Sequence, residues 1–268
     1  MSEPATLGAR HPEVKRLRAL LRDRGARDAE RAFVLEGPKV IQGALDRGVA
    51  LHAVYLGYGA RAAFGHIVEQ AHGRGIPVVE LKEGVLEKVG TTRTPQPVLA
   101  VAEHVTKPLD ALSPGGLVLV AVAVSDPGNL GTLLRSAEAA GAVGVVCTAN
   151  SVDVHNPKTV RSSAGALFGV TVVEENDPMV VLASLGAAGR RRYGTRAQAP
   201  MTYDKADLAG PVAVLLGNEA HGLDAAVSRA VDAVFSVPMA GAAESLNVAM
   251  VGTIVAFEAA RQRAVAHP

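Results

Sequence analysis

The sequence predicts an α/β protein with two domains: an N-terminal α/β domain and a C-terminal α/β domain with a largely parallel sheet. The chain has 268 residues, which is enough for two domains that each bury a core. Apolar runs of strand length alternate with segments of helical spacing along most of the chain. The continuous apolar run LVLVAVAVS, residues 117–125, is typical of a central parallel strand that is covered on both faces.

The first domain is predicted over residues 1–106. Residues 1–9 are small and polar, so we expect a frayed start. Residues 11–32 should form a helix followed by a basic connector, because apolar residues recur there at helical spacing. A short apolar run follows at 33–35. Strands and helices then alternate, with helices expected at 38–48, 62–75 and 84–90 and strands at 51–57, 76–81 and 97–105.

The second domain is predicted over residues 115–268, after a linker at 107–114 that is rich in Pro, Gly and Ser and has little periodicity. Further strand candidates follow the first apolar run, and helices are expected between most of them. These candidates are residues 144–149, 169–174, 191–197, 211–217 and 233–238. The alternation predicts a largely parallel sheet in this domain.

The charge balance gives little support for nucleic-acid binding by bulk electrostatics, because the formal net charge is only +1. Residues 1–106 carry 15 Lys and Arg against 12 Asp and Glu, whereas the remainder carries 12 against 14. The basic excess lies in the opening segment, which is either a solvated helix face or an RNA-contacting surface. Aromatic residues are only 3% of the chain, so a broad stacking platform for bases is not expected.

The sequence also indicates the cellular compartment and whether a metal site is expected. Cys147 is the single cysteine, which excludes internal disulfides, and its apolar surroundings indicate a buried strand residue. We expect a cytoplasmic protein without a membrane span or a signal peptide. The eight histidines are scattered, and the chain lacks CxxC and HExxH motifs, so no metal site is expected.

Three segments combine the end of a predicted strand with polar residues. In residues 125–141, a Pro-Gly turn leads to Asn129, which can cap the helix that follows. On that helix Arg135 lies opposite the apolar stripe, where it is either a solvated side chain or a cation directed into a cleft. In residues 211–224, Glu219 follows a buried strand and is flanked by Gly217 and Gly222.

The third segment, residues 234–260, has a short strand that stops at Pro238 and a loop of small residues. We expect Ser245 to cap the long helix that follows, with Asn247 inside it. In open parallel sheets, ligands bind beyond the carboxyl ends of the strands. All three segments should therefore lie at one edge of the sheet and form a site there.

Together these segments resemble the three motifs of the SpoU family, within the SPOUT methyltransferase superfamily. The matching residues are Asn129 to Arg135, Gly217-Asn218-Glu219 with Gly222, and Pro238 followed by Ser245-Leu246-Asn247. The segment NPKTVRSSAGALF at 156–168 is also similar to the family. Residues 10–105 resemble the ribosomal-protein-L30e-like substrate-binding domain, through FVLEG and TPQPVLAV.

The resemblance implies a deep trefoil knot near the C-terminus, a rare exception among protein folds. It also implies that S-adenosylmethionine binds in the loops of the knot. The residues implied for cofactor binding are Leu216, Gly217, Val237, Pro238, Met239 and Leu246. Those implied for catalysis are Asn129, Arg135, Glu219, Ser245 and Asn247. The family is usually homodimeric, with the active site near the interface.

The activity that the resemblance implies is methyl transfer from S-adenosylmethionine to a ribose 2′-hydroxyl of RNA, with ribosomal RNA of the large subunit as target and DNA excluded. An arginine is effectively never deprotonated, so Arg135 is expected to fix a phosphate and the ribose. Arg161 either contacts RNA or forms a structural salt bridge. Two alternatives stay open: methylation of a tRNA ribose, and an RNA-binding ribosome-assembly factor without transfer activity.

Overall fold

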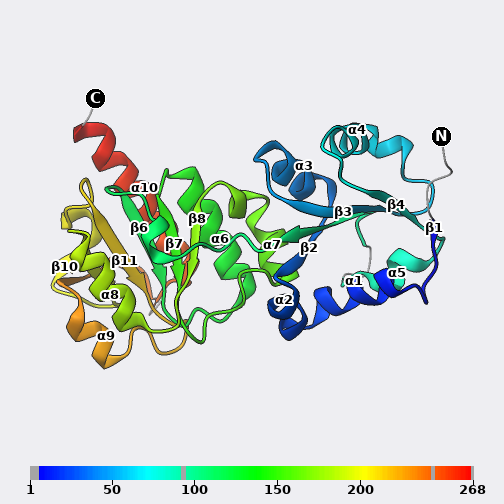
Figure 1. Cartoon of the computed structure of the whole chain (residues 1–268). Coiled ribbons are helices and arrows are strands. Elements are labelled where there is room, and N and C mark those ends of the chain that lie inside the picture. The colour runs from blue at the N-terminus through cyan, green and yellow to red at the C-terminus, as the bar shows by residue number, and fades with distance from the viewer. Residues whose placement is uncertain (1–5, 92–94, 243–244, 267–268) are drawn as a thin grey trace. The chain divides into compact units, whose positions relative to one another are not determined.

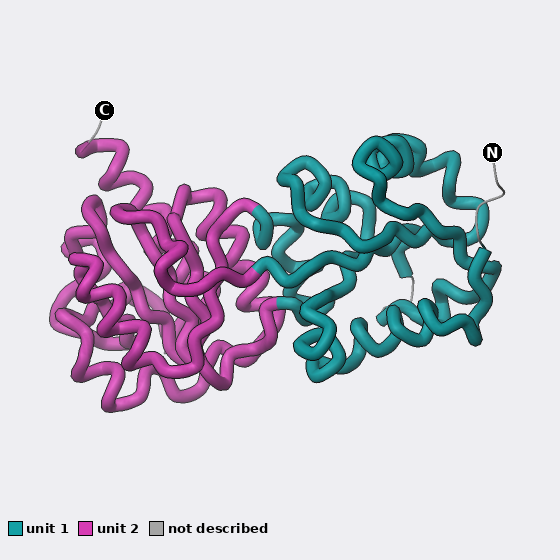
Figure 2. The backbone as a smooth tube through the Cα atoms, in the orientation of Figure 1, with its two compact units in different colours: residues 1–105, 155–168 teal, residues 106–154, 169–268 magenta. Residues whose placement is uncertain are grey.

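The computed structural model describes residues 6–91, 95–242 and 245–266, and the chain divides into two compact units (Figures 1 and 2). Unit 1 comprises residues 1–105 and 155–168, and unit 2 comprises residues 106–154 and 169–268. The predicted boundaries differ from this division in two ways. Residues 155–168 fold with the first unit, and the predicted linker folds with the second.

Within its described residues, unit 1 contains a five-stranded mixed sheet in the order β1-β4-β3-β5-β2. Strands β1, β4 and β3 are mutually parallel, and β5 runs antiparallel to β3 and β2. Its elements before residue 106 are β1 (Thr6–Leu7), α1 (Pro12–Arg22), α2 (Arg24–Glu30), β2 (Ala32–Glu36), α3 (Pro38–Asp46), β3 (Leu51–Leu56), η1 (Ala62–Phe64), α4 (Gly65–Gly73), β4 (Val78–Leu81), α5 (Val85–Val89) and β5 (Val98–Glu103).

Two expectations for the start of the chain need correction. The expected frayed start lies outside the described residues at 1–5, but Thr6–Leu7 pairs with β4 as a parallel edge strand. The expected basic connector is a second helix, α2. It begins because the carboxylate of Asp23 accepts a hydrogen bond from the Gly25 backbone N–H at 2.8 Å.

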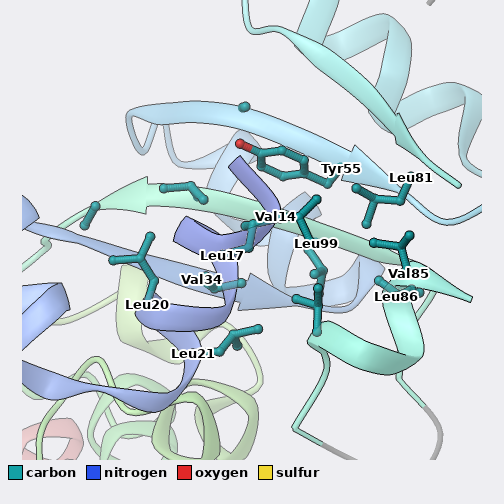
Figure 3. Packing of buried hydrophobic residues seen from close by; sticks show 14 residues of the cluster. Val14, Leu17, Leu20, Leu21, Val34, Tyr55, Leu81, Val85, Leu86 and Leu99 are labelled. Atoms are coloured by element: carbon teal, nitrogen blue, oxygen red, sulfur yellow. The ribbon is translucent and has the colours of Figure 1, made fainter. Parts of the chain in front are cut away.

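The core of unit 1 forms where α1 and α5 pack on one face of the sheet (Figure 3). The spacing predicted for the helix is confirmed, because Val14, Leu17, Leu20 and Leu21 are all buried. They meet sheet residues that include Tyr55. Full burial of each such leucine contributes about 1.5–3 kcal/mol to the free energy of unfolding, so this helix face anchors the N-terminal segment.

The segment 155–168 joins unit 1 through α7 (Pro157–Ser163), which is followed by η3 (Ala166–Phe168). Arg161 on α7 donates to Glu36 Oε2 on β2 at 2.7 Å and to Thr91 Oγ1 at 3.0 Å. The Glu36 side chain is only 1% exposed, whereas that of Arg161 is 28% exposed. Of the two alternatives for Arg161, the structure therefore shows the salt bridge.

A ring stack holds the start of the same segment. The imidazoles of His104 and His155 stack with their centroids 3.9 Å apart, and His155 packs against Phe33 of β2. The backbone N–H of Val105 donates to His155 Nε2 at 3.2 Å. Burial, and then the charge of His104 and of nearby arginines, lower the pKa of His155 to about 2, so its ring is neutral at physiological pH.

The described part of unit 2 contains a seven-stranded sheet in the order β10-β12-β9-β11-β6-β7-β8. Every neighbouring pair in it is parallel, in agreement with the largely parallel sheet that the sequence predicts. Its strands are β6 (Leu117–Ala121), β7 (Gly144–Cys147), β8 (Thr171–Glu174), β9 (Arg191–Thr195), β10 (Met201–Thr202), β11 (Val212–Leu216) and β12 (Ala233–Ser236). Its helical segments are η2 (Leu109–Ala111), α6 (Pro127–Ala139), α8 (Pro178–Ala187), η4 (Tyr203–Lys205), α9 (Ala225–Ala230) and α10 (Val248–Ala266).

Helices cover both faces of this sheet (Figure 1). Alternate residues of a strand point to opposite faces. Val118 and Val120 of β6 therefore pack with the α8 and α9 side of the core, and the other face meets α6 and α10. A Cβ at Gly252 of α10 would lie 2.2 Å from Leu133 Cδ2, so this glycine permits the close approach of α10 and α6. No helix within the described ranges is long and apolar enough to cross a membrane.

The ion pair between Arg161 and Glu36 gives the first testable prediction. Arg161→Ala leaves the Glu36 carboxylate buried without its main counter-charge, and we expect unfolding to become easier by about 2–3 kcal/mol. That is less than the ~3–5 kcal/mol of a fully buried pair, because Arg161 is partly exposed. Urea unfolding measures this loss in the free energy of unfolding. The matched double variant Glu36→Gln/Arg161→Ala should lose less than the two single variants together, and an Arg161→Ala protein as stable as the wild type would contradict the prediction.

Candidate functional site

The site lies at the carboxyl edge of the unit 2 sheet. Because all seven strands are parallel, β9, β11 and β12 end at the same edge, at Thr195, Leu216 and Ser236. The segments that follow these strands, together with the start of α10, enclose a pocket of about 620 Å³. Its lining residues are 195–197, 217–223, Phe235, Val237, Met239, 245–248 and Val251.

The carboxylate of Glu219 fastens the loop after β6 to the loop after β11. Its Oε2 accepts hydrogen bonds from the backbone N–H and the hydroxyl of Ser125, each at 3.2 Å. Its Oε1 accepts from the Asp126 backbone N–H at 3.2 Å and from Asn129 Nδ2 at 2.9 Å. Both oxygens therefore accept hydrogen bonds from residues 125–129, which lie 90 or more residues away in sequence.

Asn129 extends this network to the third predicted segment. Its Oδ1 accepts a hydrogen bond from Asn247 Nδ2 at 2.8 Å, while its own amide donates to Glu219. The three segments singled out in the sequence are thus joined by one chain of side-chain hydrogen bonds from Glu219 through Asn129 to Asn247.

Two predicted helix caps are wrong. Asp126 caps α6, because its carboxylate accepts from the Asn129 backbone N–H at 2.9 Å. Asn247 occupies the capping position of α10, because its Oδ1 accepts from the Ala249 N–H at 2.8 Å. In each case the residue expected to cap is free for another role: the Asn129 amide binds Glu219, and the exposed Ser245 lines the pocket.

The hydrogen bonds around Glu219 shift its ionisation. Burial opposes the charged form, but the Asn129 amide and backbone N–H groups, including those of Ser125 and Asp126, outweigh that cost. The pKa of Glu219 therefore lies below its ordinary value, and the carboxylate is ionised at neutral pH. A carboxylate with a lowered pKa is a poor proton acceptor, so the geometry favours a positioning role for Glu219.

The loop after β11 is a tight hairpin, and Asn218 has a structural role in it that the local pattern did not predict. Asn218 and Gly222 exchange backbone hydrogen bonds at 3.0 and 2.8 Å, and Gly222 adopts the left-handed conformation that this turn requires. Asn218 Nδ2 also donates to the Ala123 carbonyl at 2.9 Å. Ala123 itself has a positive φ of 55°, so the backbone after β6 is strained beside the site.

Gly217 is required because the returning hairpin passes directly over it. A Cβ at this position would lie 2.2 Å from the carbonyl carbon of Gly222 and 2.4 Å from the Leu223 nitrogen. Both neighbours are backbone atoms, so neither can move aside without opening the hairpin. The close approach, rather than an unusual φ, explains the glycine at this strand end.

The structure brings most of the residues expected to bind the cofactor into the pocket wall. These are Gly217, Val237, Met239 and Leu246. Leu216 is fully buried in β11, and Pro238 lines an adjoining hollow of unit 2 that also includes Met239. Their roles as cofactor contacts stay predictions.

The residues expected to act in catalysis divide into two groups. Glu219, Ser245 and Asn247 line the pocket, and Asn129 binds two of them. Arg135 is separate. It lies on the exposed face of α6, six residues after Asn129, or about 9 Å along the helix axis. It makes no hydrogen bond or ion pair with another described residue.

Sequence reasoning missed three polar residues of the pocket wall: Thr195, Arg196 and His221. Thr195 and Arg196 stand at the end of β9, in a segment that was predicted only as a strand. His221 also lines the pocket, and its ring Nδ1 lies 3.2 Å from Asn218 Oδ1. The position of β9 next to β11 was the signal that could have identified the first two residues, but strand order is not readable from periodicity.

The single cysteine of the chain is not part of the site. Cys147 lies in β7, buried as predicted, and burial raises the pKa of its thiol far above the ordinary value. Within the part of the chain that the structure describes, no group of His, Cys, Asp and Glu side chains is arranged to hold a metal ion.

Comparison with known families decides the classification. The profile of the SpoU rRNA Methylase family matches residues 116–257, which include every site residue named above. The chain belongs to the SpoU rRNA methylase family. A second profile, the MRM3-like substrate binding domain, matches residues 11–100 of unit 1.

Individual SpoU family members and solved structures resemble the chain over most of its length. RlmP of Bacillus subtilis, a 23S rRNA guanosine 2′-O-methyltransferase, is 39% identical over 68% of this chain and 72% of its own. A 23S rRNA uridine 2′-O-methyltransferase of Streptomyces viridochromogenes is 31% identical over 95% of this chain and 91% of its own. The structure of an AdoMet-bound rRNA methyltransferase from Sinorhizobium meliloti has a TM-score of 0.84 and 31% identity, and covers 96% of this chain and 98% of its own.

The close approach at Gly217 predicts that Gly217→Ala opens the hairpin at 218–222. We expect binding of S-adenosylmethionine, the ligand that the resemblance implies, to weaken more than about tenfold, with about 1–3 kcal/mol lost from stability. Isothermal titration calorimetry and urea unfolding measure the two effects. Gly210→Ala is the matched control, because a Cβ there meets nothing within 4 Å. Equal affinity in both variants would refute the role of the close approach.

The lowered pKa of Glu219 predicts a pH-dependent stability difference between the wild type and Glu219→Gln. Because the folded pKa lies below the unfolded one, the carboxylate stabilises the fold above the ordinary glutamate pKa, and this contribution is lost as pH falls through the folded pKa. Thermal unfolding from pH 7 downward should show a lower Tm for Glu219→Gln at pH 7 and a difference that shrinks in acid. The control Glu83→Gln removes an exposed carboxylate of unit 1 and should follow the wild type. A gap that is constant with pH would contradict the prediction.

Proposed function

We propose that this protein transfers the methyl group of S-adenosylmethionine to a ribose 2′-hydroxyl of RNA, and that its substrate is ribosomal RNA of the large subunit. The observation that carries the proposal is the network from Glu219 through Asn129 to Asn247, which joins the three family motifs beside one pocket. Family membership and the 23S rRNA 2′-O-methyltransferases among the similar proteins support the same activity. With ribosomal RNA as the proposed substrate, a cytoplasmic location is part of the same proposal.

The pocket fits a nucleoside-containing cofactor. Its volume of about 620 Å³ lies within the ~300–1,000 Å³ typical of small-molecule sites. Val237, Met239 and Leu246 offer apolar contacts for the adenine, and Gly217 belongs to the same pocket wall. Bound there, S-adenosylmethionine supplies an electrophilic methyl group on its sulfonium.

The residues of the chain itself must hold the ribose hydroxyl in line with that methyl group. Asn129 and Asn247 are fixed by hydrogen bonds from both sides, so their amides are rigid elements for orienting a substrate. Ser245 is exposed at the pocket wall and forms no hydrogen bond with another described residue, which leaves its hydroxyl for the substrate or the cofactor. Glu219 acts through Asn129 as a positioning residue.

Arg135 is proposed to bind a phosphate next to the target ribose. Its guanidinium offers a planar set of donors that matches phosphate oxygens, and it is not committed to an internal partner among the described residues. The homodimer that the resemblance implies remains part of this proposal. Helix α10 supports it, because it exposes the large apolar side chains Met250, Phe257 and Val265, which a second copy could cover.

The substrate-binding match in unit 1 favours ribosomal RNA over tRNA, and the activity assay can separate the two. Tritium transfer from labelled S-adenosylmethionine is measured on undermethylated 23S rRNA and, in parallel, on tRNA. Incorporation into 23S rRNA that makes one internucleotide bond resistant to alkali supports the proposal. Incorporation into tRNA alone would favour the alternative target. Cofactor binding without transfer to either RNA would point to an untested RNA or an assembly intermediate. Failure to bind the cofactor would move the conclusion to an RNA-binding assembly factor.

The role proposed for Arg135 makes a quantitative prediction in the same assay. We expect Arg135→Ala to reduce transfer by about 10²-fold or more, the size of effect seen when a substrate-positioning group is lost. Affinity for S-adenosylmethionine should stay within about twofold, because Arg135 does not line the pocket of its own chain. Arg135→Lys tests the planar fork separately from the charge and should recover only part of the activity. Full transfer by Arg135→Ala would refute the assignment.

A further inference from the structure

We propose that Arg196 is a further binding residue of the pocket and that its guanidinium takes an oxyanion of the bound substrates. Two sources could supply this chemistry: the carboxylate of the methionine portion of the methyl donor, and a phosphate of the RNA. The proposal rests on the proposed function, because both oxyanions belong to its substrates. Arg196 lies outside the three motifs, and the position of β9 between β11 and β12 brings it to the pocket wall.

The backbone at Arg196 is fixed from both neighbouring strands. The Thr195 hydroxyl donates to the Leu215 carbonyl of β11 at 3.0 Å, and the Arg196 N–H donates to the Phe235 carbonyl of β12 at 3.0 Å. Arg196 therefore stands at a defined point of the pocket wall, with an exposed side chain. A cation whose Cα is held in this way needs to order only its side chain when it binds a ligand.

Within the described residues, no acidic group of the pocket wall is available as a counter-ion for Arg196. Among the described residues that line the pocket, Arg196 is the only lysine or arginine, and Glu219 is the only aspartate or glutamate. Both oxygens of Glu219 are already engaged by donors from residues 125–129. Arg196 makes no side-chain hydrogen bond or ion pair with another described residue.

Three other arginines of the same strand region differ from Arg196, because each contacts a partner within the protein. Arg190 donates to the carbonyls of Ser113 and Gly116, Arg191 lies over the ring of Tyr193, and Arg192 pairs with Asp232. These three arginines lie just before β9 or in its first two residues, and each has a structural partner. Arg196 stands at the opposite end of the strand, where ligands bind in parallel sheets, and has none within the described residues.

The chemistry of the guanidinium matches both oxyanions. Arginine stays charged at any physiological pH, and its planar donors bind a carboxylate or a phosphate through two parallel hydrogen bonds. The shared expectation is that removing Arg196 weakens the binding of a ligand that carries an oxyanion. A ligand without an oxyanion should be unaffected.

The test compares Arg196→Ala in the full chain with the wild type and with Arg229→Ala. Arg229 is an exposed arginine of α9 outside the pocket wall, so its removal changes the net charge equally. Calorimetry measures affinity for S-adenosylhomocysteine, which has the carboxylate, and for 5′-methylthioadenosine, which lacks it. Filter binding measures affinity for 23S rRNA at several salt concentrations, and thermal unfolding checks that each variant folds.

The two sources give different results. If Arg196 binds the carboxylate, Arg196→Ala weakens S-adenosylhomocysteine binding about fivefold or more and leaves 5′-methylthioadenosine binding unchanged. If it binds a phosphate, both small-molecule affinities stay constant, RNA binding weakens, and the salt slope falls by about one. Arg229→Ala should match the wild type throughout.

Two outcomes would overturn the proposal. One is an Arg196→Ala protein that equals the wild type in all three titrations. The other is an equal loss for both small molecules, because that result indicates a disturbed pocket rather than a lost oxyanion contact. A wild-type protein that binds neither S-adenosylhomocysteine nor RNA would instead refute the proposed function itself, and the oxyanion role would fall with it.

Discussion

The site depends above all on the carboxylate of Glu219. A parallel sheet brings the ends of β6 and β11 to one edge, but it does not determine how the loops beyond those ends meet. Glu219 joins them, because its two oxygens take four hydrogen bonds from residues 125–129. The amide of Asn129 then carries the connection to the start of α10. One ionised group thus organises polar loops that have little apolar surface of their own to pack.

This arrangement separates positioning from proton transfer. The donors that hold Glu219 in place also lower its pKa, so the group that orders the site is poorly suited to accept a proton within it. Arg135 is not a plausible base either, because a guanidinium keeps its proton. These two residues can therefore contribute by alignment and by charge, and cations near the site gain importance. Arg135 and Arg196 are exposed cations of this kind, and their positions bear directly on how the site could hold a charged substrate.

Local pattern was sufficient to predict much of the fold and part of the site. The apolar runs predicted the parallel sheet, and the rule that strand ends share an edge brought Asn129, Glu219 and Asn247 together. The errors arose where two residues compete for one local role. Asp126 and Asn247 cap α6 and α10, where Asn129 and Ser245 were expected, and nothing in the spacing distinguishes these candidates. Edge strand β1 has only two residues, too few for any periodicity. Arg196 depended on strand order, which side-chain pattern does not encode.

The segment 155–168 shows how a matched family range and a folding unit can differ. It lies within the residues that the methylase profile matches, yet α7 packs on β2 and completes unit 1. The chain therefore passes between the two units three times, after residues 105, 154 and 168. Unit 1 cannot reach its full set of buried contacts from residues 1–105 alone, because Glu36 and Phe33 find partners in Arg161 and His155. Unit 1 therefore draws part of its stability from a segment that the methylase profile matches, so the boundary of the profile is not the boundary of the folding unit.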